Sequence, residues 1–405
     1  MITRRTFLAS GSVALAGYAV SSCATANGSR GAPATALRAP LDLAPVHASF
    51  DRVIRTTVGL RPHRDSGFVL RAERLGDKTL IHNYGHAGAG MSLAWGCGVM
   101  VAEFAQENGQ RRAAVVGCGS PGLTTARQLQ RRGFAVTIYA ATVPPDTTSN
   151  MSLAGFTPTT ALVNNTSRTP AWDAQFLRAA EISYTQLQLM VGKNYGVYWI
   201  DSYNATDNPE PGQGGGRGGG RGGDPDVATD ADLLPPMLRP NRNRDVLGPG
   251  EHPFPTQYAV RTPSLSIEPN MYLDALVGDF LMAGGKIVIR RFETPRDLMS
   301  VAEPIVVNCT GLGSFTLFDD KELVPIKGQL TALVAQPELH YRAGGRAPSG
   351  DQASVNPRSD GVIVGNLQDR GNWSLEPDPD VLERNVQAAI DFFSLVKPFS
   401  GARRS

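Results

Sequence analysis

The segment RRAAVVGCGSPGLTTARQLQRRGFAVTIYA, residues 111–140, decides the fold class of this chain. It reads as an apolar strand, a glycine turn, a helix and a second strand, which is the first unit of a doubly wound parallel sheet. In the GxGxxG turn, Gly117 permits a tight turn, Gly119 lets a pyrophosphate approach the backbone, and Gly122 lets helix and strand pack closely. Because the helix begins near Leu123, its N-terminus favours phosphate charge. The segment therefore predicts an α/β fold with a dinucleotide at these four residues.

One part of the dinucleotide pattern is missing after the second strand. An acidic residue usually stands there and holds the adenosine ribose, yet this chain has Ala140 and Ala141. Asp146 lies nearby, at a different spacing. The sequence therefore leaves the affinity for the nucleotide open.

The composition narrows the possible partners. The chain has 405 residues, enough for two domains, and a net charge of +2 from 39 basic and 37 acidic residues. Nothing in this balance indicates nucleic acid or a membrane. The four cysteines, Cys23, Cys97, Cys118 and Cys309, show no metal-ligand spacing, so we predict neither a metal site nor a disulfide framework. Cys97, Cys118 and Cys309 are predicted to be small buried residues.

The first 26 residues predict an export signal. They have a charged start, an apolar middle and small residues at the end, and Arg4 and Arg5 resemble the twin-arginine signal, whose machinery carries folded proteins. VSSC, ending at Cys23, resembles a lipoprotein cleavage box, whereas the following Ala24-Thr25-Ala26 suits ordinary signal peptidase. Both alternatives stay open. We expect a periplasmic or secreted protein that touches a membrane only through a lipid on Cys23.

Two segments look unable to form a core. Residues 27–50 are rich in alanine and proline and predict a linker. PEPGQGGGRGGGRGGDPD, residues 209–226, lies inside a stretch of about 205–256 that we predict to be a disordered insertion. Arginines within glycine tracts also occur in RNA-binding segments, but the absence of other basic patches favours an inert insertion.

Several further motifs resemble the D-amino-acid oxidase family of FAD-dependent oxidoreductases. They are HNYGHAGAG (82–90), WGCG (95–98), TTSNMSLAG (147–155), VNCTG (307–311), KGQL (327–330) and GNW (371–373). The resemblance implies a Rossmann-type FAD-binding domain interleaved with a mixed-sheet substrate domain. Because the family's last portion here precedes its beginning, the chain resembles a circular permutant with residues 106–112 as the connector.

The resemblance also divides the chain. It places the FAD-binding domain at residues 62–157 and 264–325. It places the substrate domain at residues 51–61, 158–263 and 326–398. The signal peptide (1–26) and the linker (27–50) precede both.

The resemblance implies which residues hold FAD outside the glycine turn. Hydroxyls and amides of TTS meet the pyrophosphate, and the N-terminus of the helix after HNYGH faces the flavin edge where negative charge gathers on reduction. The implied contacts are Gly88, Gly90, Met91, Ser92, Thr147, Thr148, Ser149, Arg291, Phe292, Thr310 and Gly311. His82 and His86 are interpreted as shaping the loop rather than as bases.

Two residues carry the implied chemistry. Arg61, in VGLRPH, matches the family's arginine that binds the substrate carboxylate through two parallel hydrogen bonds. Gly88 supplies the carbonyl that receives the substrate amine. The implied reaction oxidises an amine or amino acid to the imine by hydride transfer to flavin, with oxygen as acceptor, and it needs no acidic or basic side chain.

The substrate wall departs from the family. Ser354 and Gly350 stand where the family has two tyrosines, and Tyr341 is a candidate to replace them. Two alternatives therefore stay open. The chain could oxidise another carboxylated amine, such as an N-substituted glycine, or it could be a non-catalytic FAD-binding protein with a decayed pocket.

Overall fold

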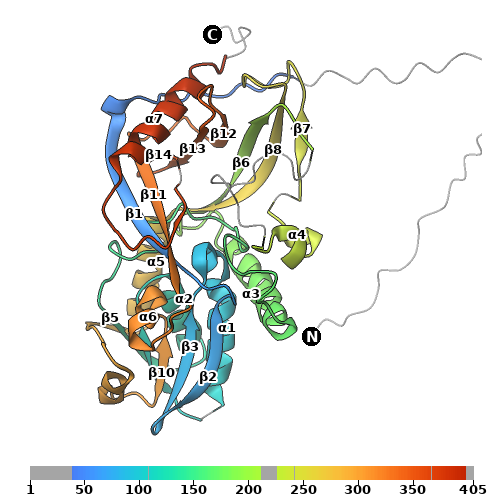
Figure 1. Ribbon diagram of the computed structural model, residues 1–405. Coiled ribbons are helices and arrows are strands. Elements are labelled where there is room, and N and C mark those ends of the chain that lie inside the picture. Colours follow the sequence, from blue (N-terminus) through green and yellow to red (C-terminus); the bar gives the residue numbers. More distant parts are fainter. Residues whose placement is uncertain (1–38, 108, 211–225, 241, 366, 398–405) are drawn as a thin grey trace, which may run out of the picture. The chain divides into compact units, whose positions relative to one another are not determined.

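Two β-sheets organise the computed structural model of this chain from Pro40 onward (Figure 1). The structure describes residues 39–107, 109–210, 226–240, 242–365 and 367–397. The predicted signal peptide, with Arg4, Arg5 and Cys23, and the predicted linker up to residue 38 lie outside the described residues.

The first sheet contains the predicted strand–turn–helix–strand unit. Its six strands, in spatial order, are β2 (Val69–Leu75), β3 (Lys78–Tyr84), β10 (Ile305–Asn308), β4 (Arg112–Val116), β5 (Ala135–Ala140) and β9 (Lys286–Ile289). All neighbours are parallel except β2, which is antiparallel to β3. Helix α2 (Ser120–Gln130) joins β4 to β5, so the prediction from residues 111–140 is confirmed.

Helices cover one face of this sheet. They are α1 (Gly90–Gln106), α2, α3 (Pro170–Gln188) and α5 (Pro269–Met282). Segment Ala87–Gln106 is long and apolar enough to cross a membrane, but most of it is buried inside the protein, as expected of a core helix. α1 and α3 pack closely because Gly96 has no side chain: a Cβ there would lie 2.3 Å from the Ala179 carbonyl oxygen.

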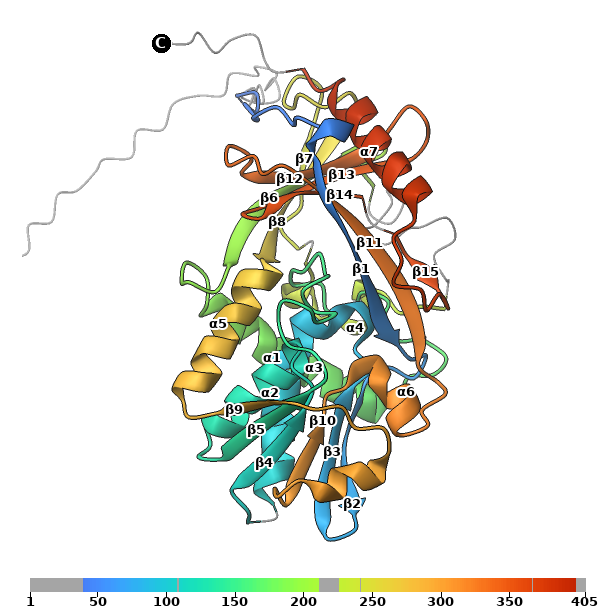
Figure 2. The same ribbon diagram turned by 90° about the vertical axis from the view of Figure 1, so that its left-hand side faces the viewer.

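The second sheet is mixed and carries the other half of the core. Its strands, in spatial order, are β1 (Val53–His63), β11 (Val324–Leu333), β14 (Gly361–Val364), β13 (Gln352–Arg358), β12 (Tyr341–Arg346), β6 (Val197–Thr206), β8 (Tyr258–Ile267) and β7 (Asp245–Leu247), with β15 (Asp369–Arg370) beside β11. Among the strands that the described residues form in this sheet, β12 and β6 pair in parallel and the other neighbours are antiparallel. Helix α7 (Pro379–Phe393) packs on one face, where Phe392, Val386 and Leu333 are buried (Figure 2).

The linker prediction is wrong from residue 40 onward. Leu41, Val46 and their apolar neighbours pack against the core beside α7. The Tyr341 hydroxyl donates to the Ala44 carbonyl oxygen (2.6 Å), and the Leu41 amide donates to the main-chain carbonyl oxygen of Glu251 (3.1 Å). Apolar residues spaced between prolines let an extended chain bury side chains without forming a helix or strand.

The predicted disordered insertion is also wrong for residues 226–240 and 242–256. This stretch contains α4 (Asp230–Leu233), the short helix η3 (Pro236–Leu238) and strand β7. Several of its apolar side chains are buried: Leu233, Leu234, Leu238, Leu247 and Phe254. The adjacent glycine tract dominated the average composition of residues 205–256, so the sequence analysis gave no weight to these apolar residues. Residues 211–225 lie outside the described part of the chain.

Candidate active site

The carboxyl ends of the five parallel strands meet at one edge of the first sheet, here called the carboxyl edge. Ligands of such sheets bind outside this edge. The predicted cofactor residues follow these strand ends: Gly88, Gly90, Met91 and Ser92 after β3; Gly117, Gly119, Gly122 and Leu123 after β4; Thr147, Thr148 and Ser149 after β5; Arg291 and Phe292 after β9; Thr310 and Gly311 after β10. The topology therefore brings all five groups to the same edge.

The glycine turn has no room for side chains. Gly117 has φ +117°, and a Cβ there would lie 2.4 Å from the Cys309 carbonyl oxygen. A Cβ on Gly122 would lie 2.0 Å from the Gly117 carbonyl oxygen. The first turn of α2 carries no acidic residue, so its partial positive charge is not neutralised. This bare backbone turn at a helix N-terminus fits the pyrophosphate of a dinucleotide.

Ser149 connects the segment after β5 to the glycine turn. The Ser120 amide donates to Ser149 Oγ (3.0 Å), which also lies 3.0 Å from where a Cβ on Gly119 would be. The Thr147 hydroxyl donates to Asn150 (2.7 Å), and Thr148 is exposed. Beyond β5, Ala141 is exposed and no acid takes the usual ribose position.

Several predicted contacts have side chains that already serve the fold. The Ser92 hydroxyl donates to the Gly155 carbonyl oxygen (2.9 Å) and accepts from the Thr157 amide (2.9 Å). The Thr310 hydroxyl donates to Asn308 (2.8 Å). Phe292 is buried and Arg291 is exposed. At Thr310 and Ser92, the main chain is thus the part left to meet a cofactor.

The loop after β3 is tightly packed. The Gly88 amide donates to the Thr160 carbonyl oxygen (3.2 Å), and a Cβ on Gly88 would lie 2.7 Å from the Thr160 methyl carbon. His86 is fully buried and stacks on Phe68, with ring centroids 5.1 Å apart. Burial lowers the pKa of His86 to about 4, so its ring is neutral at neutral pH. His82 lies between Glu73 (3.1 Å) and Asn308 (3.1 Å).

Arg61 reaches this region from the second sheet. Its guanidinium lies over Gly328 on β11, where a Cβ would come within 2.8 Å of Nη1, and Nη1 donates to the Leu367 carbonyl oxygen (3.5 Å). Burial lowers the pKa of Arg61 to about 10, which keeps it charged at neutral pH. Pro62 lies 3.8 Å from the Cβ position of Gly311. The end of β1 therefore meets the carboxyl edge.

Residues 148–155 cross the second sheet on the face that carries Arg61. A Cβ on Gly59 of β1 would lie 3.0 Å from Met151 Cβ. Arg358 donates to the Ser152 carbonyl oxygen (3.3 Å), and Arg342 donates to the Ala154 carbonyl oxygen (3.4 Å). The segment that begins with the predicted pyrophosphate contacts is thereby fixed to the substrate sheet.

Asp360 anchors this arrangement. Its carboxylate accepts from Arg358 (2.7 and 2.8 Å), Arg55 (2.6 Å) and Asn270 (3.0 Å). Asn270 in turn accepts from Asn150 (2.8 Å), in the segment after β5. Partial burial would raise the pKa of Asp360, but the hydrogen bonds and charges of Arg358 and Arg55 outweigh it and hold this pKa below its usual range.

Asp360→Asn is expected to lower the free energy of unfolding by about 2 kcal/mol at neutral pH, because Arg358 loses a buried anionic partner. A carboxylate with a depressed pKa stabilises the fold above its unfolded-state pKa of about 3.9, and this contribution is lost as the pH falls through the folded-state pKa. The gap between wild type and variant should therefore close in acid. Urea unfolding at several pH values measures it, and a gap that stays constant with pH would contradict the assignment.

Neither of the two departing positions carries a large side chain. Ser354 is partly buried on β13, and Gly350 lies in an exposed turn with φ +88°. Asn356, two residues along β13, is buried, and its side-chain amide has no hydrogen-bond partner among the described residues. Tyr341 does not replace the tyrosines: it is buried in the cluster under α7 and its hydroxyl bonds Ala44.

The three described cysteines are small buried residues, as predicted. Burial raises the pKa of Cys97 and Cys309, and it raises that of Cys118 to about 12. At neutral pH they are thiols rather than thiolate nucleophiles.

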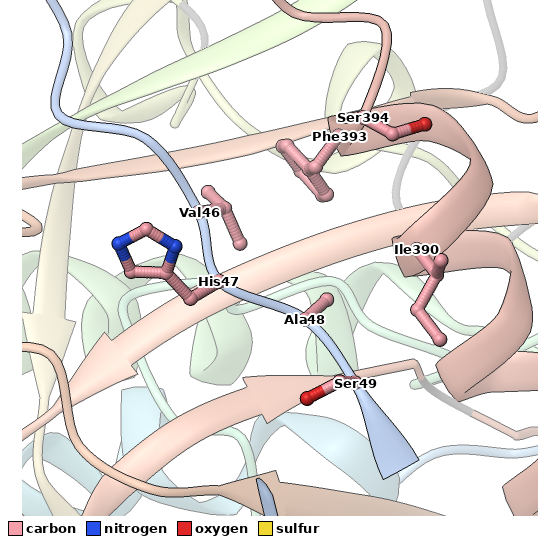
Figure 3. A pocket seen from close by; sticks show the side chains of 7 residues that line it. All are labelled: Val46, His47, Ala48, Ser49, Ile390, Phe393 and Ser394. Carbon is pink, nitrogen blue, oxygen red and sulfur yellow. The ribbon is translucent and has the colours of Figure 1, made fainter.

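Two surface hollows of about 310 Å³ each lie apart from the glycine turn and Arg61. Figure 3 shows the first, where an extended segment passes the end of α7. Its lining residues are Val46, His47, Ala48, Ser49, Ile390, Phe393 and Ser394. The second is lined by Arg64, Val69, Arg71, Glu73, His82, Tyr84, Phe318 and Asp320. Neither contains a predicted site residue.

The chain is similar in sequence to known proteins. The chain matches the family model described as "FAD dependent oxidoreductase" over residues 11–104 and 112–403. It is 28% identical to a D-amino-acid oxidase of Rubrobacter xylanophilus over 272 residues, which cover 67% of this chain and 74% of that protein. It is 33% identical to a D-amino-acid oxidase of Streptomyces coelicolor over 138 residues, covering 34% of this chain and 41% of that protein.

Solved structures also show similarity. Glycine oxidase from Bacillus cereus is 15% identical with a TM-score of 0.45, covering 70% of this chain and 78% of that chain. L-proline dehydrogenase from P. horikoshii is 13% identical with a TM-score of 0.45, covering 70% and 77%.

Proposed function

The chain belongs to the DAO family of FAD-dependent oxidoreductases, and on that premise we propose that it oxidises a carboxylated amine, such as a D-amino acid, to the imine with oxygen as electron acceptor. It is an FAD-dependent enzyme related to amino acid oxidases. The substrate, the acceptor and the site of action belong to the proposal.

The placement of Arg61 carries this proposal. A guanidinium that keeps its charge lies in a partly buried position on β1, against Gly328, where the end of β1 meets the carboxyl edge. A planar guanidinium binds a carboxylate through two parallel hydrogen bonds and so fixes the position of the adjacent carbon. This is the feature that an enzyme for carboxylated amines needs and that a purely structural FAD site does not need.

Each site residue has a defined task in this proposal. The glycine turn and the loops after β3, β5 and β10 would hold FAD, which would supply the acceptor for the hydride that leaves the substrate carbon. Arg61 binds the carboxylate, and the Gly88 carbonyl accepts a hydrogen bond from the substrate amine. These two contacts orient the carbon–hydrogen bond, and orientation alone supplies a large part of the rate enhancement. Thr160 packs against Gly88 and leaves no room for a side chain there.

The two departing positions favour a second candidate substrate. Small residues, Ser354 and Gly350, stand where the family has two tyrosines, and Gly350 lies in an exposed turn. A larger or N-substituted amine, such as an N-substituted glycine, is the substrate that we propose for a site without these tyrosines. A non-catalytic FAD-binding protein is the remaining alternative.

A substrate panel under anaerobic conditions separates these candidates. We expect the purified protein to be yellow, to release FAD on denaturation, and to bleach with one class among D-amino acids, L-amino acids and N-substituted glycines. Bleaching by N-substituted glycines alone would select the second candidate. A protein that holds FAD but bleaches with none of them would favour the non-catalytic reading.

We also propose that the chain is circularly permuted relative to its family. The family match is interrupted at residues 105–111, between the end of α1 and the start of β4. The GxGxxG strand β4, which opens the family, here follows the HNYGH strand β3, which closes it. Both strands lie beside β10 in one parallel sheet, so a short connector suffices.

Export by the twin-arginine route is the proposed cause of a periplasmic or secreted location, and Cys23 is the proposed point of any lipid anchor. Replacing Arg4 and Arg5 by lysine is expected to keep a folded, FAD-containing precursor in the cytoplasm, because the arginine pair is the recognition element. Cell fractionation measures this. Equal amounts of wild type and variant outside the inner membrane would remove the claim.

A further inference from the structure

His63 has hydrogen-bond acceptors at both ring nitrogens. Nδ1 lies 2.7 Å from the Ala161 carbonyl oxygen, and Nε2 lies 2.9 Å from Asp65 Oδ1. The side chain is fully buried at the end of β1, two residues after Arg61. A carbonyl and an ionised carboxylate accept hydrogen bonds but cannot donate them. The contact with Ala161 is therefore one that Nδ1–H donates to the carbonyl oxygen.

Asp65 faces Nε2 of this ring and two further donors. Its Oδ1 also accepts from Arg370 (2.8 Å) and from Asn164 (3.0 Å). Partial burial would raise the pKa of Asp65, but the hydrogen bonds from Arg370 and His63 outweigh it and hold this pKa below its usual range. Asp65 is thus ionised at neutral pH and accepts from all three partners.

The contact with Ala161 connects the two ends of the proposed substrate site. Ala161 follows Thr160, whose carbonyl oxygen accepts from the Gly88 amide (3.2 Å). A path of two hydrogen bonds therefore joins Arg61 to Gly88. The main chain connects Arg61 to His63, and His63 Nδ1 lies 2.7 Å from the Ala161 carbonyl oxygen. The main chain then connects Ala161 to Thr160, whose carbonyl oxygen lies 3.2 Å from the Gly88 amide nitrogen.

We propose that His63 is a positioning residue that fixes the carboxylate-binding Arg61 relative to the amine-binding Gly88 through the turn at residues 157–164. This inference rests on the proposed function for the roles of Arg61 and Gly88. The ring acts through Ala161 and Thr160 and does not touch the substrate. Without the hydrogen bond from His63 to Ala161, the substrate carboxylate still binds Arg61. The substrate amine and the reacting carbon are then no longer aligned with Gly88.

A matched pair of substitutions separates the two contacts of the ring. In His63→Asn the side-chain amide nitrogen takes the place of Nδ1 and keeps the donor to Ala161. In His63→Gln it takes the place of Nε2 and keeps the donor to Asp65. Both variants exchange a buried ring for a buried amide, so a merely structural role predicts similar losses in both.

We expect His63→Gln and His63→Asn to differ in the rate of flavin reduction and in the hydrogen exchange of residues 157–164. His63→Gln should lower the rate of flavin reduction by about 10- to 100-fold with little change in KM, because small misplacements of reacting groups cost this much. His63→Asn should stay close to wild type. Hydrogen exchange followed by mass spectrometry should show faster exchange of residues 157–164 in His63→Gln only. FAD content should be equal in all three proteins.

Equal losses of rate in the two variants, or unchanged exchange of residues 157–164 in His63→Gln, would overturn the proposal. If wild type is reduced by no carboxylated amine, the proposed function fails, while the exchange comparison still decides whether His63 holds the turn. If His63→Gln does not fold, nitrogen-15 NMR of histidine-labelled wild type provides the test, with His63→Asn assigning the signal. A His63 ring whose Nδ1 carries no hydrogen would then contradict the contact with Ala161.

Discussion

Arg61→Ala is expected to lower kcat/KM for a carboxylated amine roughly 150-fold or more. This corresponds to a loss of about 3 kcal/mol or more of transition-state stabilisation. The loss is large because the substrate carboxylate would enter a partly buried site without its bidentate partner. Arg61→Lys should restore only part of the activity, because an ammonium cannot reproduce the planar fork. Steady-state kinetics with a substrate identified by the bleaching panel measures both effects.

FAD binding is the internal control for Arg61. The residue lies on β1 over Gly328, whereas the cofactor residues follow β3, β4, β5, β9 and β10. Both variants should therefore keep the flavin content and flavin spectrum of wild type. If Arg61→Ala retained the wild-type kcat/KM, the arginine would be structural and the substrate would have another anchor.

Gly122→Ala is expected to remove FAD from the purified protein. A Cβ at this position would lie 2.0 Å from the Gly117 carbonyl oxygen, a main-chain atom that moves only if the whole turn moves. Overpacking of this severity costs about 3 kcal/mol or more. Flavin absorbance per protein, followed by titration of the apoprotein with FAD, measures the change.

Gly278→Ala is the matched control for Gly122. It makes the same chemical change within helix α5, where a new Cβ meets nothing within 4 Å. FAD content should be unchanged, and the free energy of unfolding should rise by up to about 1 kcal/mol because alanine is the better helix former. A Gly122→Ala protein with as much FAD as the control would show that the glycine turn does not hold the cofactor.

The sequence predicted the parallel sheet and its carboxyl edge well, because the information is local. Strand β4, helix α2 and strand β5 follow from the apolar pattern and the GxGxxG spacing of 30 consecutive residues. Once these strands are parallel, the loops after them must meet at one edge. The FAD-binding fold and the cofactor were therefore within reach of sequence analysis.

Contacts between distant segments were out of reach. The Tyr341 hydroxyl bonds to the Ala44 carbonyl oxygen 297 residues away, and His63 Nδ1 bonds to the Ala161 carbonyl oxygen 98 residues away. No local pattern in the sequence identifies Ala44 or Ala161 as an acceptor. The position of the Arg61 guanidinium also depends on distant segments. The sequence showed KGQL as a motif, but the pairing of β1 with β11 is what places Gly328 under the guanidinium.

Segments of unusual composition were the other source of error. Leu233, Leu238 and Phe254 are buried although a glycine tract precedes them. Leu41 and Val46 are partly buried and pack against the core from a proline-rich stretch. In both cases an average over many residues outweighed the few side chains that form the contacts. Sequence analysis of such stretches needs the individual apolar positions rather than the composition.

The central claim is that this enzyme recognises its substrate amine by the carboxylate. The most direct test measures anaerobic flavin reduction in wild type with a carboxylated amine and with its decarboxylated analogue, and repeats both with Arg61→Ala. The account predicts that wild type reduces at least about 100-fold faster with the carboxylated compound and that Arg61→Ala abolishes this preference. Equal reduction rates with the two compounds in wild type, unchanged in Arg61→Ala, would contradict it.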